Sequence, residues 1–158
     1  MSAVVHVALV PESLRGAELR ALVADADSSP RHSVSHTSGL SAIAWSDALV
    51  GIDLEVVRTR PKLERLAART MTPGERAAWS ETLDRDRGFA QHWTRVEAYL
   101  KAIGVGVKGG YLTRPGSGWS VIDLDLGGSA ATHVGAVAVE SAAPVVSLRW
   151  MTAPGTSR

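Results

Sequence analysis

A long amphipathic helix, set among short strand-like segments, constrains the fold of this chain more than any other feature. In residues 88–103, five apolar side chains recur at steps of four, three, four and three, which is the spacing of one helix face. They are Phe89, Trp93, Val96, Leu100 and Ile103. Gly104 and Gly106 follow, and glycine is common just beyond a helix C-terminus. The sequence therefore predicts one long helix whose apolar face packs against the rest of the protein.

Short segments rich in β-branched residues flank this helix and predict strands. These segments are residues 3–10, 32–36, 40–46, 49–56, 119–126, 132–140 and 144–151. Shorter helices are predicted at 12–24, 61–69 and 72–83, the last with a capping box formed by Thr72 and Glu75. Because helices and strands come in mixed order with mostly short connections, we expect an α+β fold with an antiparallel-rich sheet packed against the long helix.

The length of 158 residues predicts one domain over residues 1–152, with an N-terminal part at 1–31 and a motif-bearing part at 32–152, followed by a flexible tail at 153–158. Residues 25–31 are expected to form a Ser/Asp/Pro loop. Zero cysteines exclude disulfides, thiolate zinc sites and cysteine nucleophiles. The net charge of +1 offers no bulk field for nucleic acid. We expect no membrane span and, since no secretory leader is visible, a cytoplasmic protein.

Two carboxylates lie on one of the predicted strands. Asp53 and Glu55 are two positions apart, so both side chains point to one face, while Ile52 and Leu54 point to the other face and pack. Adjacent carboxylates repel each other unless a cation or hydrogen bonds lie between them, and Mg²⁺ prefers such hard oxygen ligands. This pattern indicates either a metal site or, taken alone, the half-solvated face of an edge strand.

A second acidic position lies on the long helix. Glu97 and Lys101 are one turn apart and project just beside the apolar stripe, at the expected rim of the core. There, Glu97 could complete a carboxylate metal site or take a proton, and Lys101 could hold a phosphate. The alternative is a helix-stabilising Glu–Lys pair worth about 0.2–0.5 kcal/mol. Trp93, one turn before Glu97, is expected to pack in the core.

Two histidines occupy one face of the predicted strand at 32–36. His32 and His36 would lie on the same side of a regular strand, but no third zinc ligand is apparent, so zinc is the weaker interpretation. Further along, Arg58, Arg60, Lys62, Arg65 and Arg69 form a basic cluster. This cluster is either a solvated helix face or a docking patch for an acidic partner.

Three motifs of this sequence resemble those of the 4′-phosphopantetheinyl transferase superfamily. Residues 51–55 (Gly-Ile-Asp-Leu-Glu) match the family's G-[VI]-D-[VIL]-E, and residues 93–101 resemble W-x-x-K-E-[AS]-x-x-K. Ser35 and His36 resemble the end of the family's N-[VIL]-S-H element. The resemblance covers residues 32–151, and residues 1–31 would correspond to a shortened N-terminal half.

The resemblance implies transfer of the phosphopantetheine arm of coenzyme A to a serine of an acyl, peptidyl or aryl carrier protein, with release of 3′,5′-ADP. Asp53, Glu55 and Glu97 would hold Mg²⁺, or Mn²⁺ in its place. Glu97 would also deprotonate the carrier serine, and Lys101 would stabilise phosphate charge and contact coenzyme A. His36 would contact the nucleotide part of coenzyme A.

The chain departs from the family pattern at two places. Val96 stands where the family has lysine, and the neighbouring Arg95 projects about 100° away on the helix. The segment before Ser35 is short, so a homo-oligomer that shares its site between subunits is one expectation. The alternative to an enzyme is a catalytically degenerate homologue that binds a carrier protein or coenzyme A without transfer.

Overall fold

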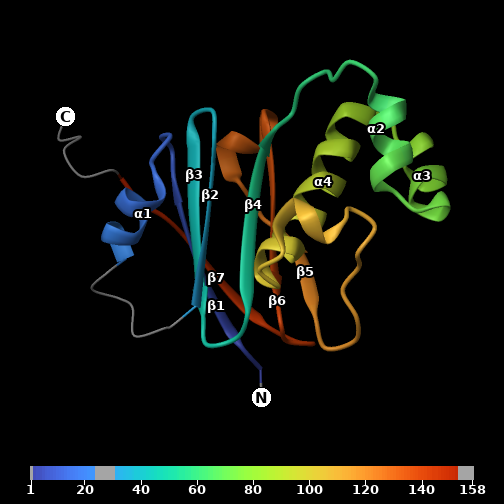
Figure 1. The fold of residues 1–158 in the computed structure, drawn as a ribbon. Coiled ribbons are helices and arrows are strands. Elements are labelled where there is room, and N and C mark those ends of the chain that lie inside the picture. The colour runs from blue at the N-terminus through green and yellow to red at the C-terminus, as the bar shows by residue number, and fades with distance from the viewer. Residues whose placement is uncertain (1, 24–30, 153–158) are drawn as a thin grey trace.

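The computed structural model describes residues 2–23 and 31–152, and these form four layers in which two sheets lie between helices (Figure 1). The strands are β1 (Val4–Val10), β2 (Arg31–Thr37), β3 (Leu40–Ser46), β4 (Val50–Val56), β5 (Ser120–Asp123), β6 (His133–Val139) and β7 (Val145–Trp150). The α-helices are α1 (Gly16–Val23), α2 (Leu63–Thr70), α3 (Pro73–Ser80) and α4 (Arg85–Ala102). The described residues also include the short 3₁₀ helices η2 (Gly106–Gly109) and η3 (Gly127–Ala131).

The strands divide into a four-stranded sheet with the order β2-β3-β1-β7 and a three-stranded sheet with the order β4-β6-β5. All pairs are antiparallel except β1 with β7, which run parallel. The main core lies between the sheets, where Val7 and Leu9 of β1 meet Ile52 and Leu54 of β4. The expected α+β fold with an antiparallel-rich sheet against a long helix is confirmed, with the sheet divided in two.

Helices cover the outer faces of both sheets. The α1 helix covers the four-stranded sheet through Leu19 and Val23, and α4 covers the three-stranded sheet through Ala98 and Ala102 (Figure 1). On its other side α4 packs against α2 and α3, where Phe89 is buried. The first two residues of the predicted stripe, Phe89 and Trp93, pack with α2 and α3, whereas Ile103 at its end packs in the cluster that joins α4 to the sheet.

Several element boundaries differ from those predicted, for local reasons. The α4 helix begins at Arg85 rather than 88 because the Asp84 carboxylate accepts a hydrogen bond from the Arg87 amide and caps the helix. The α3 helix has the predicted capping box but ends at Ser80, before the fully exposed Leu83. The β5 strand ends at Asp123, well short of 126.

The loop predicted at 25–31 lies mostly, and the tail predicted at 153–158 entirely, outside the described residues. Within the described part of the chain, no helix is both long and apolar enough to cross a lipid bilayer.

Candidate active site

The β4 strand presents its two carboxylates to the α4 helix. Asp53 and Glu55 alternate with Ile52 and Leu54, whose side chains are buried in the core between the sheets. Asp53 pairs across the sheet with Ala136 of β6, so only a methyl group lies beside it there. Asp53 is 7% exposed, which excludes the half-solvated edge strand for this carboxylate.

Gly51 brings α4 close to this face of β4. A Cβ atom at Gly51 would clash with the α4 backbone at Ala98 and Ala102. Since backbone cannot move aside as a flexible side chain can, only glycine allows this approach. The first residue of the Gly-Ile-Asp-Leu-Glu motif thereby sets the distance between the carboxylates of β4 and the polar side chains of α4.

The two oxygens of Asp53 have different surroundings. Oδ1 accepts hydrogen bonds from Lys101 Nζ at 2.8 Å and from the Ser35 hydroxyl at 3.2 Å. Oδ2 is buried and has no hydrogen-bond partner. Because a buried polar atom without a partner is costly, Oδ2 is a candidate ligand for a group that the protein itself does not supply.

Glu97, on α4, resembles Asp53 in having a buried carboxylate oxygen without a partner. Its side chain is 9% exposed, and its Oε1 atom is buried without a hydrogen-bond partner. Glu97 is more buried than the predicted position at the rim of the core implied, because it lies near Asp53 and Lys101 at the contact between α4 and β4. Glu55 is half-buried instead, and its carboxylate binds Arg60 at 3.0 Å.

The pKa values of all three acids are raised. Burial is the main cause for Asp53, and the ammonium of Lys101 opposes it. For Glu97 and Glu55, burial acts first and the negative charge of Asp53 adds to it. Mutual repulsion among desolvated carboxylates favours uptake of a proton or of a cation. This site can therefore bind a positive group that neutralises it.

Lys101 supplies part of that positive charge. Besides Asp53, its ammonium donates to the Ile52 carbonyl at 3.0 Å and approaches the Val34 carbonyl at 3.4 Å. The interpretation of Lys101 as the partner of Glu97 in a helix-surface pair was wrong, because Lys101 forms its ion pair across to β4. A contact between Lys101 and phosphate stays a prediction, and it requires the ammonium to give up part of this network.

The structure does not bring the histidines to the carboxylates. Ser35 faces Asp53, so strand alternation places His36 on the other face of β2, where it is exposed. His32 is exposed as well, and no third ligand joins the two histidines among the described residues. The nucleotide contact of His36 stays a prediction, while the zinc interpretation lacks support.

Two carboxylate oxygens are available as ligands for a metal ion that a substrate phosphate would help to bind. No three acidic or histidine side chains form a ready metal cluster in residues 2–23 and 31–152. However, Mg²⁺ in phosphate-transfer sites is commonly bound by one or two carboxylates together with substrate phosphates. The free Asp53 Oδ2 and Glu97 Oε1 atoms provide two such oxygens, and both belong to acids whose charges need neutralisation.

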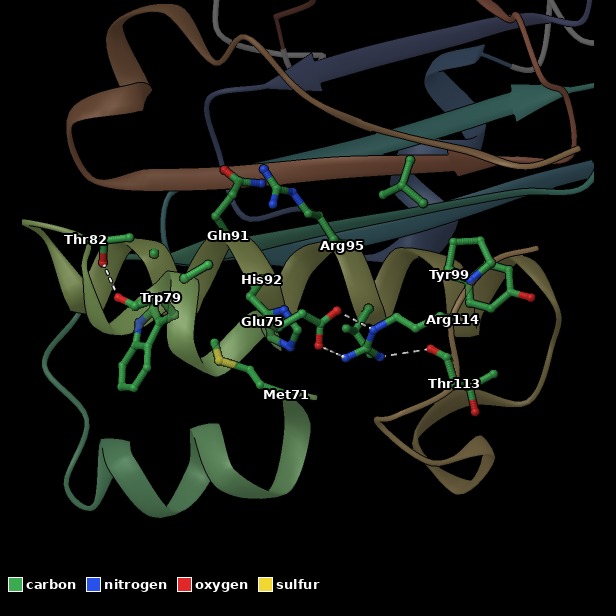
Figure 2. A pocket seen from close by; sticks show the side chains of 15 residues that line it. Met71, Glu75, Trp79, Thr82, Gln91, His92, Arg95, Tyr99, Thr113 and Arg114 are labelled. Carbon is green, nitrogen blue, oxygen red and sulfur yellow. Dashed lines mark hydrogen bonds and ion pairs between the residues drawn. The ribbon is translucent and has the colours of Figure 1, made fainter. Parts of the chain in front are cut away.

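A separate cavity of about 510 Å³ lies on the other side of α4, between α3 and the loop at 111–115 (Figure 2). Its charged groups are already paired: Arg114 binds Glu75 at 2.6 Å, and Arg95 binds Asp123 at 2.5 Å. The Arg114 guanidinium lowers the pKa of Glu75 to about 2. The carboxylate site and this cavity therefore differ in whether their charges are compensated.

Val96, the departure from the family motif, lines this cavity and is 5% exposed. Its burial agrees with its place on the predicted apolar stripe. The neighbouring Arg95 does not replace the missing lysine, because both ends of its guanidinium bind the Asp123 carboxylate.

Comparisons with known proteins agree with these motifs. The sequence model of the 4′-phosphopantetheinyl transferase superfamily matches residues 49–142, more than half of the chain, and the chain belongs to this superfamily. It is 36% identical over 86 residues to a Synechocystis protein whose name gives 4′-phosphopantetheinyl transferase as a provisional assignment. It is also 36% identical over 85 residues to the 4′-phosphopantetheinyl transferase HetI of Nostoc.

These matches cover 52% of this chain in both cases, and 35% and 36% of the two relatives. The matched part is thus about a third of each relative's length. The family-matched region includes Asp53, Glu55, Glu97 and Lys101, while β2 with Ser35 and His36 precedes it.

Sequence reasoning named Asp53, Glu55, Glu97 and Lys101, and the structure places them around the β4–α4 contact. It gave Ser35 no role of its own and included Arg60 only in a basic cluster. The alternation of Ser33 and Ser35 with apolar or exposed residues on β2 was the available signal for a polar contact with β4. Nothing in the sequence indicated that Arg60 would turn back to Glu55.

Proposed function

We propose that this chain transfers the 4′-phosphopantetheine arm of coenzyme A to a serine of an acyl, peptidyl or aryl carrier protein, with Mg²⁺ as the cofactor. The observation that carries the proposal is the pair of buried, unpartnered carboxylate oxygens on Asp53 and Glu97. Membership of the superfamily supports the reaction class, because its members are defined by this transfer. The named activity of the relatives supports it as well.

Asp53 and Glu97 would hold the metal, and Glu55, the third predicted ligand, would have to release Arg60 to join them. When bound, Mg²⁺ neutralises charge on the pyrophosphate of coenzyme A, which is the main requirement of phosphoryl-type transfer. Mn²⁺ has similar ligand preferences and is the alternative ion. Mn²⁺ is also useful as a spectroscopic probe.

The chain's own groups would act on the serine and on the phosphates. The serine oxygen forms a bond to the phosphorus that bears the pantetheine arm, and the bond from that phosphorus to the 3′,5′-ADP oxygen breaks. Glu97, whose raised pKa suits a proton acceptor, takes the hydroxyl proton directly or through water. Lys101 leaves part of its network with Asp53 and Ile52 to stabilise the charge on the departing phosphate.

Two further contacts belong to the same proposal. His36 would contact the nucleotide of coenzyme A from the exposed face of β2. The exposed Lys62, Arg65 and Arg69 on and before α2 would attract an acidic carrier protein. Substituting these three by serine should slow association at low salt more than at high salt.

Intact-mass spectrometry of apo carrier proteins incubated with this protein, coenzyme A and Mg²⁺ tests the proposal. We expect a gain of one phosphopantetheine mass that EDTA prevents. A carrier mass that stays unchanged, while calorimetry still detects coenzyme A binding, would favour the degenerate homologue. The observation that favours this second candidate is Val96 in place of the family lysine.

A further inference from the structure

Serine hydroxyls join the edges of the two sheets beside the candidate site. The β2 strand is one edge of the four-stranded sheet, and β4 is one edge of the three-stranded sheet. The Ile52 amide of β4 donates to the Ser33 hydroxyl at 3.1 Å, and the Leu54 amide donates to the Ser35 hydroxyl at 3.0 Å. These hydroxyls replace the carbonyl acceptors that a neighbouring strand would provide.

The two serines differ in what else they bind. The Ser35 hydroxyl, besides accepting from Leu54, donates its one hydrogen to Asp53 Oδ1 at 3.2 Å. Ser35 is 5% exposed, so water competes little for this bond. A hydroxyl has one hydrogen, and the direction of the Ser35 hydrogen is therefore determined by Asp53. Among the recorded contacts, the Ser33 hydroxyl binds only the β4 backbone, at the Ile52 amide.

The Ser35 contact restrains the rotation of the Asp53 carboxylate. Ser35 holds the backbone amide that follows Asp53 and, with the same oxygen, the Asp53 side chain. Lys101 binds Oδ1 as well, at 2.8 Å. Two donors thus occupy Oδ1, and the buried Oδ2 is left without a partner. A carboxylate that rotated freely would instead exchange its two oxygens between these positions.

We propose that Ser35 is a positioning residue for Asp53: its hydroxyl holds Oδ1 on the side of β2 and leaves Oδ2 directed toward a bound divalent cation. This inference rests on the proposed function, because it deepens the role of Asp53 in that site. In this proposal Ser35 acts through Asp53, the side chain that its hydroxyl contacts. Hydrogen-bond partners of ligating carboxylates orient them, and losing such a partner typically weakens metal binding 10–100-fold.

Ser33 provides the matched control for this proposal. It lies on the same strand and accepts from a β4 amide at nearly the same distance as Ser35 does. Ser33→Ala therefore removes one side-chain bond between the sheets but leaves the Asp53 contact in place. A merely structural role for Ser35 predicts that both alanine variants behave alike.

The test is a titration with Mn²⁺ followed by electron paramagnetic resonance, with and without coenzyme A. The proteins are the wild type, Asp53→Asn, Ser35→Ala, Ser33→Ala and Ser35→Thr, each with its melting temperature. We expect Ser35→Ala to raise the Mn²⁺ dissociation constant about 10–100-fold, Ser33→Ala to leave it unchanged, and Ser35→Thr to restore it. Ser35→Ala and Ser33→Ala should lower the melting temperature by similar amounts.

Equal Mn²⁺ affinity in Ser35→Ala and wild type would overturn the role of Ser35 while leaving the metal site intact. If the wild type shows no Mn²⁺ binding that is lost in Asp53→Asn, the metal part of the proposed function is overturned. The role of Ser35 is then overturned with it. If Ser35→Ala does not fold, Ser35→Cys replaces it, because a thiol keeps the volume but forms weaker hydrogen bonds. Its dissociation constant should then lie above that of the wild type, and an unchanged value would overturn the proposal.

Discussion

The acids on the two sides of the α4 helix differ in their hydrogen-bond partners and in the direction of their pKa shifts. Glu75, on the cavity side, receives two bonds from Arg114 and closes the capping box at the Thr72 amide. On the β4 side, Asp53 and Glu97 each keep a buried oxygen without a partner. The pKa of Glu75 is lowered to about 2, whereas the pKa values of Asp53 and Glu97 are raised.

Under the proposed function, this difference separates an acid that stabilises the fold from acids that bind a ligand. A carboxylate that contributes to stability is charged in the fold and surrounded by donors. A desolvated carboxylate that lacks donors reduces the stability of the empty site, and acids perturbed in this way are candidates for functional sites. The direction of the pKa shift therefore predicts which substitutions affect transfer and which affect folding.

The largest effect is expected from the unsatisfied acids. Asp53→Asn and Glu97→Gln should each lower the rate of transfer by at least about 100-fold, because charge stabilisation at the phosphates is lost. Glu97→Gln should keep or raise the melting temperature at neutral pH, since it removes a repelled charge. Carrier mass spectrometry and thermal denaturation measure the two effects. Undiminished turnover in either variant would contradict the assignment of these acids to the site.

Gly51→Ala should have the next largest effect, because the new methyl group meets the α4 backbone at Ala98 and Ala102. Overpacking of this kind costs about 1–3 kcal/mol, and the displaced helix would also separate Glu97 from Asp53. Denaturant unfolding measures the loss. Gly74→Ala is the control, since a Cβ there meets nothing within 4 Å. Equal stability of the two variants would mean that α4 does not depend on Gly51 for its position.

Glu75→Gln should reverse the pattern of Glu97→Gln, with a loss of about 1–2 kcal/mol of stability and little change in transfer. The pKa of Glu75 falls from 4.5 to about 2 on folding, so its contribution is present above pH 4.5 and is lost as the pH falls toward 2. The variant should therefore lose less stability than the wild type over this range. Urea unfolding at several pH values checks this, with the exposed Glu140→Gln as control.

The smallest effect is expected from Val96→Lys, which restores the family's residue on the cavity side of α4. If the missing lysine limits activity, transfer should rise by up to about tenfold, equivalent to about 1.4 kcal/mol in the barrier. Val96→Met is the control for chain length without charge. The kcat/KM for coenzyme A measures the effect. An unchanged value would mean that the missing lysine does not limit transfer.

Much of the site was predictable because it depends on local periodicity. A strand repeat of two places Asp53 and Glu55 on one face, and a helix repeat places Glu97 and Lys101 one turn apart. The capping box at Thr72 was predictable for the same reason, since its bonds span three residues. The start of α4 was missed, although Asp84 was a local signal for it.

Other features depend on contacts between distant parts of the chain. The parallel pairing of β1 with β7 joins strands from opposite ends of the described chain. Burial of Glu97 depends on the covering of α4 by a sheet on one side and by two helices on another. Neither follows from the pattern of a single segment, because a periodic stripe identifies an apolar face without identifying what covers it.

The sequence by itself determined which groups this protein has available: the alternating acids of β4, the glycine before them, and the Glu and Lys of α4. Short-range geometry places these side chains on defined faces, and the motifs identify the superfamily. Only the tertiary structure decided their pairings. Lys101 binds Asp53 rather than Glu97, and Ser35 reaches Asp53 from another sheet, because the close packing of α4 and β2 on β4 brings these groups within hydrogen-bond distance.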